Sequence, residues 1–101
     1  MARTFAEVKD SHRRRAILKM LAEDVDYAIN DSLMQAGLDA VGHGVSRDRV
    51  LGDFSWLAEQ GLIKEQRIDD HMTLATITQR GLDVAKGRAD VHGVERPLPG
   101  E

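Results

Sequence analysis

Apolar residues recur at three- and four-residue spacing between positions 46 and 61 of the chain. They are Val50, Leu51, Phe54, Leu57 and Ala58. This spacing predicts an amphipathic helix, and Ser46 is a good N-cap because its hydroxyl can accept from a free N–H of the first turn. Gly61 follows the last turn, where a residue with positive φ commonly ends a helix. Leu62 and Ile63 then begin a strand, so the segment has the form of a recognition helix that leads into the wing of a winged helix-turn-helix.

A second helix is predicted before this one, from Asn30 to about Val41. Asn30 is a strong N-cap. The apolar or small residues after it have core spacing, at Leu33, Met34, Gly37, Leu38 and Val41. Gly42 and Gly44 form a tight turn between the two helices. Residues 26–29, Asp-Tyr-Ala-Ile, are too few for a helix and can form a small third strand.

Two β-prone segments, 62–68 and 72–78, are separated by Asp-Asp-His at 69–71 and predict a hairpin. Their alternation is imperfect, so the register stays open. Thr78 can cap a short last helix, from Gln79 to Lys86, which Gly87 would end. Beyond it the chain is punctuated by Gly and Pro, which indicates an extended tail.

The expected fold class is mainly α with a small β-hairpin, a winged helix-turn-helix. It would have a three-helix core, a two- or three-stranded wing and a short C-terminal helix. We expect residues 1–88 to form this domain and residues 89–101 to form the tail.

The first helix carries apolar residues on two faces. Thr4 and Glu7 have the spacing of a capping box, which predicts a helix of about 20 residues. One face holds Phe5, Val8, His12 and Ala16, and the opposite face holds Ile17, Leu18, Leu21 and Val25. Either the helix breaks near Asp10 and Ser11, or its first half packs outside the core of this domain. A homodimer interface at Phe5 and Val8 is one explanation, and a loosely ordered N-terminus is the other.

Composition limits the functions open to the chain. The 101 residues carry a net charge of −3, whereas dedicated nucleic-acid-binding domains more often have a pI above about 9. There is no cysteine, so neither disulfides nor thiolate metal sites can form. No long apolar run or leader-like segment stands out, so we expect no membrane contact and a cytoplasmic location.

The start of the predicted recognition helix would face the base edges of duplex DNA. The candidate residues there are Ser46, Arg47, Arg49 and Asp53, and the wing would offer Lys64 and Arg67 to phosphates. An arginine can make the bidentate contact to guanine that most often specifies a base. Acidic residues oppose this interpretation, since Asp48, Asp53 and Glu59 share the helix and Asp69 and Asp70 occupy the hairpin turn.

Two other features concern what the protein could bind. Arg13, Arg14 and Arg15 form the one concentrated run of positive charge, and we interpret it mainly as a solvated helical face, because three consecutive residues spread around a helix. Trp56 lies one helical turn from Gly52, nearly opposite Phe54. An exposed Trp beside a glycine notch can anchor a protein partner, and the alternative is that Trp56 folds onto a neighbouring element.

Motifs for catalysis or cofactor binding are absent. The sequence contains no phosphate-binding glycine loop, dinucleotide fingerprint, zinc-protease motif or nucleophile elbow. The four histidines lie in different predicted elements and never at i, i+4 spacing. We therefore expect no enzyme, no cofactor and no metal site.

Three stretches together resemble a family of small proteins from Mu-like phages and prophages. They are residues 26–33, residues 46–62 and residues 76–85, and Gly-Val-Glu-Arg-Pro at 93–97 fits as well. Members of this family are labelled by fold similarity as regulators of the arsenic-repressor (ArsR) type. The resemblance implies a winged helix in a phage or bacterial setting and transfers no functional residue. The cysteines of metal-sensing ArsR proteins are absent here.

Two functions follow as hypotheses. The first is DNA binding in phage transcription regulation, with double-stranded DNA as the partner and a homodimer as the binding unit. The second is a winged helix that binds a protein during phage assembly or host takeover, without binding DNA.

Overall fold

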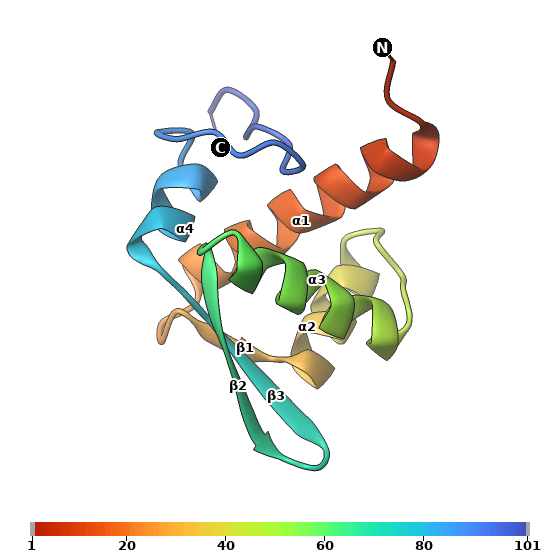
Figure 1. The fold of residues 1–101 in the computed structure, drawn as a ribbon, viewed down its shortest axis with the longest axis vertical. Coiled ribbons are helices and arrows are strands. Elements are labelled where there is room, and N and C mark those ends of the chain that lie inside the picture. Colours follow the sequence, from red (N-terminus) through yellow and green to blue (C-terminus); the bar gives the residue numbers. More distant parts are fainter. Residues whose placement is uncertain (1, 101) are drawn as a thin grey trace.

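The computed structural model describes residues 2–100. It contains four helices and a three-stranded antiparallel sheet in the order β1-β3-β2 (Figure 1). The elements are α1 (Phe5–Glu23), β1 (Ala28–Asn30), α2 (Asp31–Ala40), α3 (Arg47–Glu59), β2 (Ile63–Asp69), β3 (Met72–Ile77) and α4 (Gln79–Ala85). The three-helix core, the wing with its third strand and the short last helix are those of a winged helix-turn-helix.

The four predicted N-caps are confirmed. The side chains of Thr4, Asn30, Ser46 and Thr78 each accept a hydrogen bond from a backbone N–H in the first turn of the helix that follows. Thr4 and Glu7 form a complete capping box. Gly61 ends α3 with φ 75°, a backbone conformation that glycine adopts without strain.

The core lies where the second half of α1 meets α2, α3 and the inner face of the sheet. Its members are Ile17, Leu18, Leu21, Ile29, Met34, Leu38, Val50, Phe54, Leu57, Leu62, Ile63, Ala75, Ile77, Val84 and Val91. Two residues that we placed at core spacing are exposed instead, Leu33 at 59% and Val41 at 58%. Val25, which we placed on one helix face with Leu18 and Leu21, is 90% exposed. Val25 and Val41 lie just beyond the ends of their helices, where the chain has turned away from the core.

Helix α1 is unbroken, so of the two alternatives the break near Asp10 and Ser11 is wrong. Its first half extends beyond the core and past α3 (Figure 1). Residues 89–100 form no helix or strand, and they pack beside this part of α1. The backbone N–H of Glu95 donates to the carbonyl of Ser11 at 3.1 Å. The tail thus packs along one side of the first half of α1, and Phe5 stays exposed beyond it.

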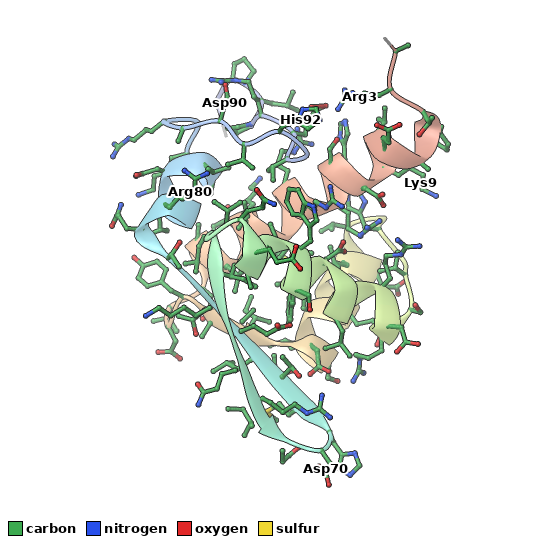
Figure 2. The ribbon with its side chains drawn as sticks, viewed as in Figure 1. Arg3, Lys9, Asp70, Arg80, Asp90 and His92 are labelled. Carbon is green, nitrogen blue, oxygen red and sulfur yellow. The ribbon has the colours of Figure 1, made fainter. Side chains whose placement is uncertain are left out.

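The wing is a hairpin of β2 and β3 with Ile63 opposite Ile77. The register shifts between Arg67 and Asp69, near the turn. From Lys64 onward every residue of β2 is exposed, so the wing extends into solvent. Figure 2 places Asp70 at its tip.

Candidate nucleic-acid interface

Helix α3 buries Val50, Phe54 and Leu57 and directs its opposite side to solvent. The exposed residues along it are Asp48, Arg49, Gly52, Ser55 and Glu59. Strand β2 follows directly, and the Ser55 hydroxyl donates to the Glu65 carboxylate at 3.3 Å. One continuous surface, formed by the outer side of α3 and by β2, is therefore open to a partner. We call it the α3–wing surface.

The predicted DNA-contacting residues differ in whether their side chains are engaged in hydrogen bonds within the protein. Ser46 accepts from the backbone N–H of Arg49 at 3.2 Å, so its hydroxyl is engaged in capping. The side chains of Arg49 and Lys64 are exposed. Arg67 folds back over the wing turn, donating to the Asp70 carbonyl at 2.6 Å and to the Thr73 hydroxyl at 3.2 Å. Arg67 therefore shapes the turn, although it remains exposed.

Arg47 is held against α2. Its Nε donates to Oε1 of Gln35 at 2.9 Å, and its Nη1 lies 3.6 Å from Oδ2 of Asp31. Gln35 in turn donates through Nε2 to the carbonyl of Val45 at 3.1 Å. These contacts connect the first residue of α3 to the helix before it. No sequence signal identifies them, because the partners belong to different elements.

Asp53 does not face a partner. It is 3% exposed and accepts two hydrogen bonds from the Arg13 guanidinium, at 2.5 Å to Nε and 2.9 Å to Nη2. The structure thus removes Asp53 from the surface that a DNA duplex could reach. The same pair corrects the interpretation of Arg13, which is buried rather than solvated.

The pKa of Arg13 is raised above its ordinary value. The largest cause is the hydrogen bond to the Asp53 carboxylate, which outweighs the opposing effect of burial, and Asp10 adds to it. Asp10 accepts from Nη2 of Arg13 at 2.8 Å. The guanidinium therefore joins a carboxylate on each of two helices, α1 and α3.

Trp56 is half-buried and packs against the core. The Arg14 guanidinium stacks on its ring, 3.9 Å from the centroid, and Arg14 also donates to the carbonyl of Gly93 at 3.1 Å. A depression of about 370 Å³ opens beside Trp56 and is lined by Arg14, Arg49 and Gly52 among others. Trp56 thus joins α3 to the tail while part of its ring borders an open notch.

Acidic side chains outnumber basic ones on the α3–wing surface. Arg49, Lys64 and Arg67 are its cations, whereas its carboxylates are Asp48, Glu59, Glu65, Asp69 and Asp70. Phosphate neutralisation supplies most of the affinity of nonspecific DNA binding. The charge of this surface therefore opposes nonspecific DNA binding.

Two further observations concern other kinds of site. Within residues 2–100, no three histidine, cysteine, aspartate or glutamate side chains are grouped so as to hold a metal ion. The same residues include no helix with the length and hydrophobicity needed to cross a membrane.

Solved structures share the fold. RosR of H. salinarum superposes with a TM-score of 0.62 at 20% identity, over 80% of this chain and 80% of that one. ZitR of Lactococcus lactis gives a TM-score of 0.60 at 30% identity, over 83% of this chain and 58% of the ZitR chain. Both are winged-helix proteins, in agreement with the architecture described above.

Relatives of similar length are closer in sequence. The protein is 42% identical to an uncharacterised Haemophilus influenzae protein over 79 residues, which are 78% of this chain and 76% of that one. It is 45% identical to the uncharacterised protein gp26 of Escherichia phage Mu over 93 residues, which are 92% of this chain and 95% of gp26. No family model matches the sequence. The relationship to gp26 spans nearly both chains, and the protein belongs to the family of phage Mu gp26.

Proposed function

We propose that this protein is a winged-helix DNA-binding protein of Mu-like phages and prophages that regulates transcription. The observation that carries the proposal is the position of α3, which is capped by Ser46 and borders an exposed wing. In a helix-turn-helix protein such a helix enters the major groove with its first residues toward the bases. The structural neighbours RosR and ZitR are transcriptional regulators, which supports the same function.

In this proposal Ser46, Arg47 and Arg49 lie at the groove end of α3, and Lys64 and Arg67 approach phosphates from the wing. With about two phosphate contacts per monomer, the logarithm of affinity should fall with the logarithm of salt concentration with a slope of about −2. That slope is shallow for a DNA-binding protein. Specific binding should therefore persist at physiological salt better than nonspecific binding does.

Selection of binding sites from a random duplex library tests the proposal directly. The wild-type protein should enrich a defined sequence, and Lys64→Ala should weaken its binding to all sequences alike. Lys86→Ala is the matched control, because Lys86 is an exposed lysine just beyond α4, away from the α3–wing surface. If no sequence is enriched and binding vanishes at physiological salt, DNA is not the partner.

The charge of the α3–wing surface favours a second function, binding of a protein during phage assembly or host takeover. Its excess of carboxylates suits a basic protein surface better than a phosphate backbone, and the notch between Gly52 and Trp56 could receive a side chain. A pull-down from infected cells, with and without nuclease, separates the two functions. Capture of one protein that survives nuclease treatment would favour this alternative over DNA.

A further inference from the structure

A buried carboxylate connects the wing to the recognition helix. Asp31 is the first residue of α2 and is 3% exposed. Its Oδ1 accepts a hydrogen bond from the backbone N–H of Thr73 in β3 at 3.2 Å. Its Oδ2 lies 3.6 Å from Nη1 of Arg47 in α3. A buried carboxylate left without its cation is strongly unfavourable, so Asp31 holds Arg47 in place.

Arg47 has a second tie to α2. Gln35 accepts from Nε of Arg47 at 2.9 Å and uses its amide nitrogen to donate to the Val45 carbonyl at 3.1 Å. Both the oxygen and the nitrogen of the Gln35 side-chain amide are therefore hydrogen-bonded. Gln35 orients the guanidinium and braces the turn between α2 and α3. Rotation of the Arg47 side chain toward a base edge would break its hydrogen bond to Gln35 and leave Asp31 without this cation.

The same series of contacts reaches the wing turn. The Thr73 hydroxyl accepts from Nη1 of Arg67, and Arg67 also donates to the Asp70 carbonyl. A path of direct contacts thus runs from α3 through Asp31 to the hairpin tip. The two elements that would touch a duplex, α3 and the wing, are joined through one buried side chain.

Arg49 differs from Arg47 in every one of these respects. It is exposed, and within residues 2–100 no side-chain hydrogen bond or ion pair involves its guanidinium. It is the third residue of α3 and borders the open depression beside Gly52. An unattached arginine at this place can make the bidentate contact to guanine without losing an internal bond.

We infer that Arg49 is the base-reading arginine of each monomer, whereas Arg47 is a positioning residue that fixes α3 relative to the wing through Asp31. This inference rests on the proposed DNA-binding function. It assigns the protein to duplex sites in which one guanine per monomer dominates direct recognition. The remaining selectivity then comes from the spacing between the groove contact and the wing contact, which Asp31 holds constant.

Binding-site selection with Arg47→Ala and Arg49→Ala separates the two roles. Arg49→Ala should abolish the preference at one base position, reducing affinity for the preferred site about five- to hundred-fold while leaving the melting temperature unchanged. Arg47→Ala should retain the base preference, bind every sequence more weakly and melt at a lower temperature. The inference is overturned if Arg47→Ala loses one base preference and Arg49→Ala loses none.

Amide hydrogen exchange at Thr73 tests the positioning role without DNA. Arg47→Ala should speed exchange of this amide by about two- to ten-fold, because the carboxylate that accepts from it is no longer held. Asp31→Asn should have a similar effect, and adding Arg47→Ala to Asp31→Asn should change exchange little further. Arg49→Ala is the control and should leave Thr73 unaffected.

Binding-site selection and amide exchange at Thr73 distinguish a failure of the proposed function from a failure of the positioning role. If the wild-type protein selects no DNA sequence, the proposed function fails and the assignment of Arg49 fails with it, whereas Thr73 exchange still decides the role of Arg47. If Arg47→Ala leaves Thr73 exchange at the wild-type rate, the positioning role is wrong even in a protein that binds DNA.

Discussion

Arg13 and Asp53 form a bidentate ion pair between α1 and α3, with side chains only 5% and 4% exposed. The two bonds measure 2.5 Å and 2.9 Å. Removing one partner of such a buried pair costs more stability than replacing both partners with apolar residues, because the remaining charge loses its counter-charge. The contact therefore fixes the position of α3 against α1, and its loss should destabilise the whole domain.

We expect Asp53→Ala to lower the free energy of unfolding by up to about 3 kcal/mol, because it leaves the buried Arg13 guanidinium with Asp10 as its remaining carboxylate partner. Equilibrium urea unfolding measures this difference. Asp48→Ala removes an exposed carboxylate from the same helix and should stay within about 0.5 kcal/mol of wild type. Equal effects of the two variants would contradict a buried pair.

Trp56→Ala should lower the melting temperature, since the ring packs on the core, carries the Arg14 guanidinium and contacts the tail. We expect a loss of about 2 kcal/mol or more and faster proteolysis of residues 89–100. Trp56→Phe keeps an aromatic ring under Arg14 and should retain much of the stability. An unchanged melting temperature would instead support Trp56 as an anchor for a protein partner.

Gly93 provides an independent test of the same contact. It has φ +98°, and an added Cβ would lie 2.7 Å from Cζ2 of Trp56. Gly93→Ala should therefore release the tail. Gly42 has a similar φ of +88° with open space around it, so Gly42→Ala measures the backbone strain alone, about 1–2 kcal/mol. Equal losses in the two variants would mean that the contact with Trp56 contributes nothing.

The elements of this fold were predictable because their signals are local. Each N-cap is a hydrogen bond between residues three apart, so Asn30 and Ser46 indicate helix starts without any knowledge of the rest of the chain. The spacing of Val50, Phe54 and Leu57 likewise identifies the buried side of α3. Helix starts therefore followed from short stretches of sequence, as did the core positions of α3, whereas Leu33 and Val41 were placed at core spacing and are exposed.

The contacts of the candidate site were not predictable in the same way. Asp53 looks like a solvent-facing carboxylate of α3 until α1 brings Arg13 to it from 40 positions away. The tie between Arg47 and Asp31 also joins separate helices. Helical periodicity reports which residues share a side of one helix, whereas the partner of a buried charge depends on how helices pack.

Stability should decrease as the pH falls through the range in which His43 titrates. Its pKa is lowered, first by burial and then by the positive charge of Arg13 and other cations of α1. The unfolded chain therefore binds a proton more readily, and the stabilisation present above the unfolded pKa of about 6.5 is lost as the pH falls through the folded pKa. Urea unfolding at about pH 7.5 and about pH 5.5 measures the loss.

His43→Gln should flatten this part of the pH dependence, because glutamine does not titrate. His71→Gln is the matched control, since His71 is exposed in the wing turn. A pH dependence that persists unchanged in His43→Gln would assign the effect to other groups.

A homodimer through the first half of α1 remains a prediction. Phe5 is 77% exposed and Val8 is half-buried, although the tail packs on α1 of its own chain rather than being left for a partner. Sedimentation at micromolar concentration should show a dimer that Phe5→Glu converts to a monomer, because a charge would be buried in an apolar contact. Val25→Glu is the control, since Val25 is 90% exposed and lies beyond the far end of the helix.

Point substitution is a sharper test of the dimer than deletion of residues 1–9. The deletion would also remove Arg3, which lies 3.5 Å from the Glu95 carboxylate, and so would loosen the tail. Phe5→Glu leaves that ion pair intact, so a change in mass reports the interface alone. If the wild-type protein sediments as a monomer at about 100 µM, Phe5 has no self-association role, and any two-fold DNA site must be occupied by separate monomers.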